Sequence, residues 1–564
     1  MSEIPSDPRR KPWATRIAGI VVALATLALM IATEPRLAIV WDEGYTLGRE
    51  QRIRWWYQAL RDPPAFASTW IPPPLELVQP DRVTALTRSE VDTRTKLFSK
   101  RALDWFWPFA REEPHGHPPF YAIVGMIGDL LTPSWQVLPR ARLGPMLFFS
   151  ITAGCLASFT AARWGILASI VTVAAWVVQP HLFAHGHYAT LDALLTSLWV
   201  LALIAFAKSI ERGKRGPHWG WVIGFGVLAG WLADTKLTGW FLPIPLLAWT
   251  ALARERRGLL TLIFGGFVAV ITLYVFNPCW WHGPISGVWR FLQSNLSRGK
   301  TIPIPLLFLG TVVRTPVESL PWYNTLVWTA MASPAGFLIL ALIGVARSVK
   351  TWKSEPILGL AVASWVFLLL LRSLPHTPGH DGTRQILAAF GVMPIIVGAG
   401  LVEISRWSRR VARLVAGASI TEAALGLAVI MPVPLSYYSP LVGGLPGAVK
   451  LGMEPTYFWD ALNDDALHWL NRNTPTGQRI QFATFPTSWL YLKQVGKLEP
   501  EILPGTPGTI AYYVLQNRPG ALTPLDKALI ASGRPAHVVF KFGVPLVWIY
   551  PYQQVDMWNR GELR

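Results

Sequence analysis

Residues 17–43 read IAGIVVALATLALMIATEPRLAIVWDE, a long apolar run that stops directly before two adjacent acidic residues, Asp42 and Glu43. A run of about 20 apolar residues is long enough to cross a bilayer as a helix, so residues 17–40 are expected to form a membrane span. No basic residue adjoins the two carboxylates in the sequence. Because ionisable groups at a membrane edge are costly unless they are paired or used, Asp42 and Glu43 are the first candidates for a functional site.

The composition extends this prediction to the whole chain. Of its 564 residues, 52% are hydrophobic and only 15% are charged, and Trp occurs 29 times, which is typical of a polytopic membrane protein. The net charge of +18 comes in good part from Lys and Arg in short loops between apolar segments, as the charge bias that orients membrane helices requires. Membrane lipids are therefore the expected anionic partners, and nucleic acid is not expected. Cys155 and Cys279 form neither a disulfide framework nor a zinc pattern.

The apolar segments predict a bundle of about 11 membrane spans. They occupy residues 17–40, 142–162, 164–184, 191–207, 218–234, 238–253, 258–276, 326–346, 357–372, 386–403 and 412–437. The basic clusters between them then fall on the side of the N-terminus, and the C-terminus lies on the opposite side. These clusters are Arg163 and residues 208–215, 254–257, 347–353 and 406–410. Arg9, Arg10 and Lys11 precede the first run, but the run is long and has no clear cleavage site, so it is expected to remain as the first helix.

One apolar stretch, residues 118–131, is predicted not to cross the membrane. It is short, it contains Asp129, and counting it as a span would move every later basic cluster to the other side. We therefore expect it to lie in the outer interface. The outer loops are then residues 41–141, 277–325 and 373–385. This arrangement predicts a membrane domain of residues 1–437 and a soluble outer domain of residues 438–564.

The tail has the pattern of a small α/β domain. Short β-type runs and helical pieces are separated by Pro and Gly turns, and roughly 100 residues are enough for a modest core. The predicted strands are 479–484, 509–515, 537–542 and 544–550, and the predicted helices are 461–471 and 524–532. The predicted fold class is therefore mainly α: a polytopic helical bundle with interfacial helices in the first outer loop and a small outer α/β domain.

Ionisable residues that the charge bias does not explain gather in the outer loops. They occur at Asp42 and Glu43, in EEPHGHPP at 112–119, in HGHYATLD at 185–192, and at 376–384 with His380, Asp381 and Arg384. A carboxylate that faces a cavity at the membrane edge can take the proton from an acceptor hydroxyl. A nearby Arg or Lys can hold a phosphate that leaves. The outer face is therefore the predicted place of the chemistry.

These motifs resemble the polyprenyl-phosphate-sugar glycosyltransferases, a family related to the dolichyl-phosphate-mannose protein mannosyltransferases and the bacterial aminoarabinose transferases. The resemblance covers nearly the whole chain. The matching stretches are Asp42-Glu43, His117-Pro118-Pro119, Ala189-Thr190-Leu191-Asp192, Pro321-Trp322-Tyr323, Arg384, and LSYYSPLVGG at 435–444. Each motif is short, but their order and their common predicted side carry the resemblance.

The resemblance implies a membrane enzyme of the glycosyltransferase C fold that transfers a sugar from a polyprenyl monophosphate to an acceptor hydroxyl. The reaction would take place on the periplasmic side of a bacterial inner membrane, and the acceptor would be a glycan, a lipid or a protein. Asp42 would be the general base, with Glu43 supporting it. The donor phosphate or substrate would be bound by His117, His187, Asp192, Lys236 and Arg384. A single displacement would invert the anomeric configuration, no cofactor is required, and the chain has no Gly-rich phosphate loop for a nucleotide sugar.

Other interpretations of the same residues stay open. Asp192 stands where it could cap a helix, and His117, before two prolines, could only shape a turn. Lys236 and Arg384 could extend to lipid head groups. A transporter or flippase of lipid-linked sugars is the alternative function.

A metal site is a further alternative. Two His-Gly-His triplets, at 115–117 and 185–187, space their imidazoles so that both could reach one ion. No Cys ligand and no Glu-x-x-His motif supports them. The resemblance adds one more metal alternative: the oligosaccharyltransferases, distant relatives of this family, use a divalent ion with acidic ligands, so a divalent ion at Asp42 and Asp192 stays open.

Overall fold

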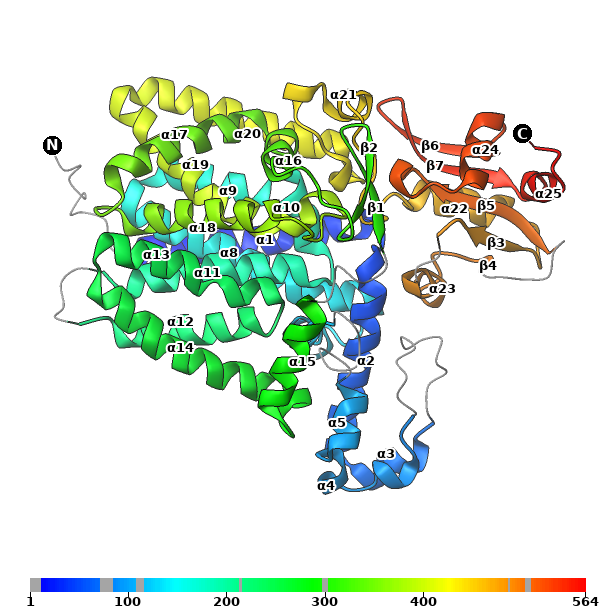
Figure 1. The fold of residues 1–564 in the computed structure, drawn as a ribbon, viewed down its shortest axis with the longest axis horizontal. Helices are drawn as coiled ribbons and strands as arrows, with labels where there is room; N and C mark the ends of the chain where they lie inside the picture. The colour runs from blue at the N-terminus through cyan, green and yellow to red at the C-terminus, as the bar shows by residue number, and fades with distance from the viewer. Residues whose placement is uncertain are drawn as a thin grey trace.

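The computed structural model describes residues 12–71, 85–107, 116–211, 216–296, 303–484, 487–502 and 509–563. The motifs at 9–11 and 112–115 and part of the basic cluster 208–215 lie outside these ranges. The chain forms a long helical part with a smaller sheet-containing domain at one end (Figure 1).

The helices of the membrane part run side by side along the long axis of the molecule (Figure 1). Seven of the described helices are long and apolar enough to cross a bilayer, and the bent pair α9 and α10 would make eight. This pair is bent by 61°, and Pro180 begins its second helix. The helices of this part are α1 (Pro12–Thr33), α8 (Val137–Trp164), α9 (Ile166–Val177), α10 (Pro180–His187), α11 (Leu191–Ser209), α12 (Trp219–Ala233), α13 (Pro243–Ala253), α14 (Arg256–Phe276), α16 (Asn324–Ala332), α17 (Ala335–Thr351), α18 (Pro356–Ser373), α19 (Leu387–Trp407) and α20 (Arg409–Ile430).

Helices α11 and α19 form the centre of the bundle. Their apolar stretches are 89% and 94% buried, because α8, α9, α12, α17 and α18 pack around them. By contrast, α1, α14 and α20 keep most of their apolar side chains exposed. A helix that is apolar all round belongs either in a core or against lipid, so the outer helices are the expected lipid-facing wall.

Some predicted spans have different bounds in the structure. The first α-helix ends at Thr33 and the candidate span at Arg36, not at residue 40, because Glu34–Arg36 form a separate 3-10 turn that contains a proline. Residues 326–346 are divided between α16 and α17, with Pro334 at the break. Because α12 and α13 are shorter apolar helices, the total of about 11 spans stays a prediction.

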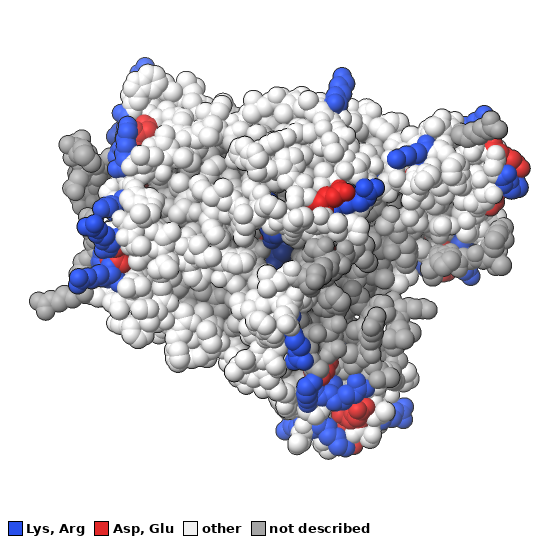
Figure 2. Space-filling view, viewed as in Figure 1, with Lys and Arg blue, Asp and Glu red and all other residues white. Residues whose placement is uncertain are grey.

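Charged side chains concentrate at the two ends of the bundle. Figure 2 shows a broad face with few Lys, Arg, Asp or Glu residues between a mostly basic end on the left and a mixed end to the right and below. Arg163, Lys208 and Arg254 lie at the C-terminal ends of α8, α11 and α13. This pattern agrees with the predicted clustering of the basic loops on one side.

Short helices and a hairpin lie at the end opposite to the basic one. Helix α2 (Trp41–Arg61) runs across this end (Figure 1). Helices α6 and α7 together reach only from Phe120 to Leu131, which is too short to cross a bilayer, as predicted. Strands β1 and β2 form an antiparallel hairpin that the sequence did not predict. The bounds are α3 (Pro63–Thr69), α4 (Arg94–Leu97), α5 (Lys100–Phe106), α6 (Phe120–Gly125), α7 (Ile127–Leu131), α15 (Pro284–Leu296), β1 (Ile304–Phe308) and β2 (Thr311–Thr315).

The C-terminal domain is built on a sheet of five described strands in the order β4-β3-β5-β7-β6. Strand β3 pairs in parallel with β4 and β5, and β7 pairs antiparallel with β5 and β6. The four predicted strands are confirmed to within two residues, whereas the predicted helix 461–471 begins later because Asn463 caps it. The elements are α21 (Gly444–Lys450), α22 (Asp464–Asn473), β3 (Arg479–Phe482), α23 (Leu490–Gln494), β4 (Glu501–Ile502), β5 (Ile510–Gln516), α24 (Pro524–Ser532), β6 (His537–Lys541), β7 (Val544–Pro551) and α25 (Gln553–Asn559).

Candidate active site

A cavity of about 500 Å³ opens where the end of the bundle that carries α2 meets the C-terminal domain. Its walls come from α2, from strand β1, from the 3-10 turn that precedes α19 (η6, Gly382–Ile386) and from the C-terminal domain. Its charged and histidine side chains are those of Asp42, Arg49, His117, Lys236, His380, Asp381, Arg384 and Arg518. Four predicted site residues, Asp42, His117, Lys236 and Arg384, therefore line one cavity.

Arg384 joins the carboxylates around this cavity. Its guanidinium donates from Nη2 to Asp42, from Nε to Asp192 at 2.7 Å and from Nη1 to Asp381 at 2.9 Å. The Arg384 side chain is only 7% exposed. Charge-assisted bonds of this kind are among the strongest that proteins form. One side chain thus connects α2, the start of α11 and η6, which are far apart in the sequence.

The network continues on both sides of this guanidinium. Lys236 donates from Nζ to Asp192 at 2.7 Å. Arg518, from the C-terminal domain, donates to Asp381 and to Glu454, both at 3.1 Å. Burying an ionised group is costly unless it is paired, and each of these carboxylates has a cationic partner. The C-terminal domain is therefore part of the charge network of the cavity.

Asp42 is the most exposed carboxylate of this network, although Asp381 also lines the cavity. The side chain of Asp42 is 20% exposed, whereas that of Asp192 is 1% exposed. Burial raises the pKa of Asp42 above its ordinary value, although Arg384 acts in the opposite direction. A partly accessible carboxylate that is a stronger base than usual is suited to accept a proton from a hydroxyl.

Asp192 has a supporting position. It lies in the first turn of α11, but Thr190 occupies the capping position, so the alternative that Asp192 caps this helix is wrong. Its two oxygens accept bonds from Lys236 and from Arg384. It lines a small pocket of about 10 Å³ next to the main cavity. Asp192 thus orients the two cations that reach into the cavity.

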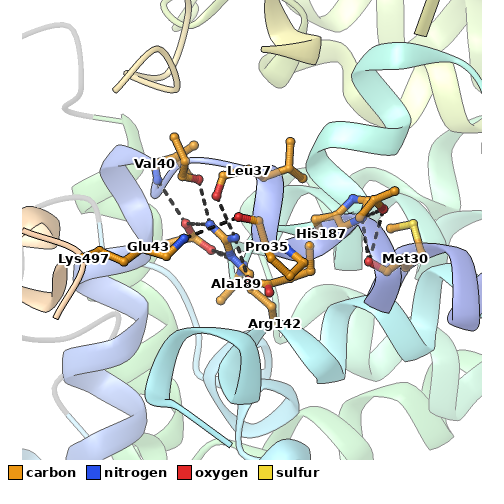
Figure 3. A network of polar contacts seen from close by, with 12 residues as sticks. Met30, Pro35, Leu37, Val40, Glu43, Arg142, His187, Ala189 and Lys497 are labelled. Carbon is orange, nitrogen blue, oxygen red and sulfur yellow. Dashed lines mark hydrogen bonds and ion pairs between the residues drawn. The ribbon is translucent and has the colours of Figure 1, made fainter. Parts of the chain in front are cut away.

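Glu43 holds α2 against the bundle and does not line the cavity (Figure 3). Its carboxylate accepts two bonds from Arg142 of α8, both at 2.7 Å, and one each from the backbone N–H groups of Val40 at 3.0 Å and Ala189 at 2.9 Å. The side chains of Glu43 and Arg142 are both 0% exposed. Glu43 therefore fixes the start of α2, and with it the position of Asp42.

Replacing Arg142 with Ala should destabilise the protein by about 3–5 kcal/mol, because Glu43 and Glu34 would be left buried without their cationic partner. Denaturant unfolding in mixed micelles measures this change. The matched control is Arg163→Ala, which removes a partly exposed pair with Glu211 and should cost less than about 1 kcal/mol. Equal stability of the two variants would contradict the anchoring role of Glu43.

The two predicted histidines have different surroundings. The ring nitrogens of His187 lie 2.7 Å from the carbonyl oxygen of Phe183 and 3.1 Å from that of Met30, so this buried ring packs α10 against α1 (Figure 3). His187 does not line the cavity. His117 is half-buried and does line it. Of the two, His117 is the one within reach of a substrate in the cavity.

The cavity wall also contains residues that no sequence motif indicated. Arg49 lies seven residues after Asp42 on α2, and Tyr45 lies between them at the i+3 position, so one face of this helix lines the cavity. That spacing was visible in the sequence and could have identified Arg49. Trp459 and Arg518 also line the cavity, and no local motif distinguishes them.

The metal site that the sequence left open can be compared with the positions of the His, Cys, Asp and Glu side chains. Among the residues that the structure describes, no group of three or more His, Cys, Asp or Glu side chains could hold a metal ion. At the cavity, Arg384 already provides a cation that Asp42 and Asp192 share. A divalent ion at these two carboxylates stays a prediction.

Part of the chain matches a known family. Residues 117–282 match the model of the family described as dolichyl-phosphate-mannose-protein mannosyltransferase. The matched segment begins at His117 of the cavity and includes Asp192 and Lys236. None of the curated proteins matches the chain in sequence.

The whole chain is similar in structure to ArnT from Cupriavidus metallidurans. The structure of ArnT bound to undecaprenyl phosphate is 15% identical in sequence, with a TM-score of 0.50 over 94% of this chain and 97% of that chain. The apo structure is 14% identical, with a TM-score of 0.51 over 95% and 98%. The chain has the glycosyltransferase C fold.

The glycosyltransferase C fold confirms the fold class predicted from the sequence. The predicted enzyme class, a glycosyltransferase, is also the class of the matching family and of the matching structures. A more remote match is the oligosaccharyltransferase of Archaeoglobus fulgidus tethered to an acceptor peptide, at 10% identity and a TM-score of 0.39 over 88% of this chain and 69% of that chain.

Proposed function

We propose that this chain transfers a sugar from a polyprenyl monophosphate to an acceptor hydroxyl at the outer end of the bundle, with Asp42 as the general base. One observation carries the proposal: a partly exposed carboxylate and the cations Lys236 and Arg384 line the same cavity. Two findings support the donor class. The matching ArnT structure holds undecaprenyl phosphate, and the matching family is named for a dolichyl-phosphate sugar.

The proposed step is a single displacement. The acceptor oxygen attacks the anomeric carbon while its proton passes to Asp42. The bond between the anomeric carbon and the phosphate oxygen breaks, and its electron pair leaves with the polyprenyl phosphate. Lys236 and Arg384 stabilise the charge that develops on this leaving group. The attack comes from the face opposite to the leaving group, so the configuration inverts, and Asp42 then releases its proton to water. No cofactor takes part in this step.

Through the contact between Arg384 and Asp42, donor binding would also change the basicity of Asp42. In the structure the guanidinium of Arg384 binds Asp42. A donor phosphate would compete for the same guanidinium, because it is also an anion that binds Arg strongly. Arg384 lowers the pKa of Asp42, so its movement toward the phosphate would make Asp42 a stronger base. Donor binding is therefore expected to activate the base for the acceptor.

We propose further that the cavity faces the periplasm of a bacterial inner membrane. The basic ends of α8, α11 and α13 lie at the end of the bundle away from the cavity, and basic loops favour the cytoplasmic side. The C-terminal domain would then also lie in the periplasm. The acceptor, whether a glycan, a lipid or a protein, would reach the cavity from that side.

A transporter or flippase of lipid-linked sugars is the alternative to an enzyme. Transporters of this kind typically bind substrate near the middle of the bilayer on interrupted helices. In the described part of this chain, the ionic network around Arg384 lies at the end of the bundle, beside the C-terminal domain. This position favours transfer at the membrane surface over transport through the bundle.

Mass spectrometry of the lipids that co-purify with the full chain tests the proposed donor. A polyprenyl monophosphate, with or without a sugar, is expected to be enriched over its share of the membrane, because Lys236 and Arg384 would bind its phosphate. The matched sample is the Arg384→Ala variant, in which the enrichment should fall. Recovery of ordinary phospholipids alone from the wild-type chain would contradict the proposal.

A further inference from the structure

Two tryptophans form an aromatic corner in the wall of the cavity. Trp41 is the first residue of α2 and directly precedes Asp42, and Trp459 belongs to the segment that leads into the C-terminal domain. Their ring centroids are 5.7 Å apart and the ring planes meet at 36°. Both side chains line the cavity and are half-buried. An aromatic surface therefore stands beside the proposed base and is open to a ligand.

The backbone holds Trp459 in this position at a conformational cost. Phe458 and Trp459 have φ values of 58° and 63°, a left-handed conformation that is unfavourable for bulky side chains. Strain of this kind persists only where surrounding contacts enforce it, and it is common at binding sites. Here the N–H of Trp41 donates to the carbonyl oxygen of Phe458 at 3.2 Å.

Two cations of the network pack on the same segment. The guanidinium of Arg384 lies 4.2 Å from the ring centroid of Phe458, and that of Arg518 lies 4.9 Å from the ring centroid of Trp459. Cations favour the faces of aromatic rings, so these contacts stabilise the strained turn. The position of the aromatic corner is thus tied to Arg518 and to Arg384, the residue that would bind the proposed donor.

Two polar groups of the cavity wall have hydrogen-bonding capacity that the described residues do not use. Arg518 lines the cavity with its side chain only 3% exposed, and its Nη2 has no hydrogen-bond partner among the described residues. The amide oxygen of Gln385, another residue of the cavity wall, also has none in the described part of the chain. A buried donor or acceptor without a hydrogen bond costs free energy, which points to a ligand that supplies hydroxyl groups.

We propose that Trp41, Trp459, Arg518 and Gln385 form a subsite for a sugar ring. A pyranose offers an apolar C–H face that packs on indole rings and a rim of hydroxyls that both donate and accept hydrogen bonds. A polyprenyl tail would leave Arg518 and Gln385 unpartnered. A phosphate would bind at Lys236 and Arg384 instead. This inference rests on the proposed transfer reaction and adds that the C-terminal domain helps to select the sugar.

The sugar in this subsite belongs either to the donor or to the acceptor. In both cases a ring stacked on Trp41 lies next to Asp42, which directly follows it on α2. The two sources share the same chemistry but differ in one measurable property. A donor sugar is attached to the polyprenyl phosphate, whereas an acceptor sugar binds without it.

The test is a set of binding measurements on the full chain in phosphatidylcholine nanodiscs, because alkyl glucoside and maltoside detergents carry sugar rings of their own. The ligands are undecaprenyl phosphate, the same carrier bearing a hexose, an N-acetylhexosamine or a pentose, and the matching methyl glycosides. The variants are Trp459→Leu, Trp459→Phe and the control Trp407→Leu, which changes a tryptophan that is 81% exposed at the end of α19.

Wild-type protein is expected to bind at least one sugar ligand, and Trp459→Leu to weaken that binding about tenfold, the equivalent of one good stacking contact. Binding of undecaprenyl phosphate without a sugar should not change. Trp459→Phe keeps a ring and should retain most of the affinity, and Trp407→Leu should have no effect. A loss confined to the sugar-bearing carrier identifies the donor sugar, and a loss confined to the methyl glycoside identifies an acceptor sugar.

Equal affinities of Trp459→Leu and wild type for every sugar ligand, or no sugar binding by the wild type, would overturn the subsite. Failure of the proposed function looks different. In that case the wild type would not bind undecaprenyl phosphate at all, while the methyl glycosides would still report on Trp459. The two hypotheses therefore fail in separate arms of the experiment.

Discussion

Changing Asp42 to Asn is expected to abolish sugar transfer. Asn is nearly the same size as Asp but cannot take up a proton from the acceptor, so the variant keeps the shape of the cavity and loses the base. Its amide oxygen can still accept a hydrogen bond from Arg384, so the fold should be retained. General base catalysis contributes about 10²- to 10⁴-fold, and a loss of transfer of at least about 10²-fold is expected.

Release of polyprenyl phosphate in proteoliposomes, supplied with sugar-loaded carrier and an envelope extract as acceptor, measures this effect. The matched control is Asp62→Asn, which makes the same change at an exposed carboxylate at the end of α2 and should leave the rate unchanged. The wild-type rate should fall as the pH drops through the pKa of Asp42, because the protonated carboxyl is no longer a base. Burial raises that pKa above its ordinary value, so the fall should begin at a higher pH than for an exposed Asp. Turnover by Asp42→Asn at the wild-type rate would remove Asp42 from the base role.

Changing Arg384 to Ala is expected to weaken donor binding about 10- to 100-fold. A hydrogen bond to a charged group is worth about 1.5–3 kcal/mol, which corresponds to this range of affinity. Lys236 and Arg518 still pair with Asp192 and Asp381, so the cavity should persist without the central guanidinium. Arg384→Lys keeps the charge but lacks the fork that contacts several carboxylates at once, and its affinity should lie between those of Ala and wild type.

The affinity for undecaprenyl phosphate, measured by titration in nanodiscs, reports this change directly. Arg410→Ala is the matched control, because Arg410 is exposed near the start of α20, at the other end of the bundle. It removes the same charge without touching the cavity. A folded Arg384→Ala variant that binds the carrier as tightly as wild type would contradict the proposed role of Arg384.

Local patterns predicted most of the elements of the fold. The runs at 191–207 and 386–403 are confirmed as α11 and α19, since a helix satisfies its own backbone hydrogen bonds inside an apolar medium. The strands of the C-terminal domain could be predicted because their apolar runs end at Pro and Gly turns. Boundaries were wrong where a proline interrupted a long apolar run, as after Thr33 and at Pro334. The β1–β2 hairpin was missed, since two short strands in a long loop leave a weak signal.

The sequence predicted part of the candidate site. Asp42, Asp192 and Arg384 each stand next to an apolar run, and the charge bias puts those run ends on one side of the membrane. The same reasoning selected Glu43, which instead binds Arg142 inside the protein. One step along a helix turns the side chain by about 100°, so neighbouring residues face different surroundings. Closeness in the sequence could not separate Asp42 from Glu43.

The sequence by itself determined that this protein is a membrane helical bundle with ionisable groups gathered at one end. Apolar length and charge bias act segment by segment, so they can be recognised without knowing how the segments pack. Only the tertiary structure decided that Arg518 and Trp459, from the other end of the chain, complete the cavity around Asp42. Those contacts depend on how α2, α19 and the sheet domain dock against one another. Docking is governed by packing over the whole molecule, so it cannot be recognised from the sequence of any single segment.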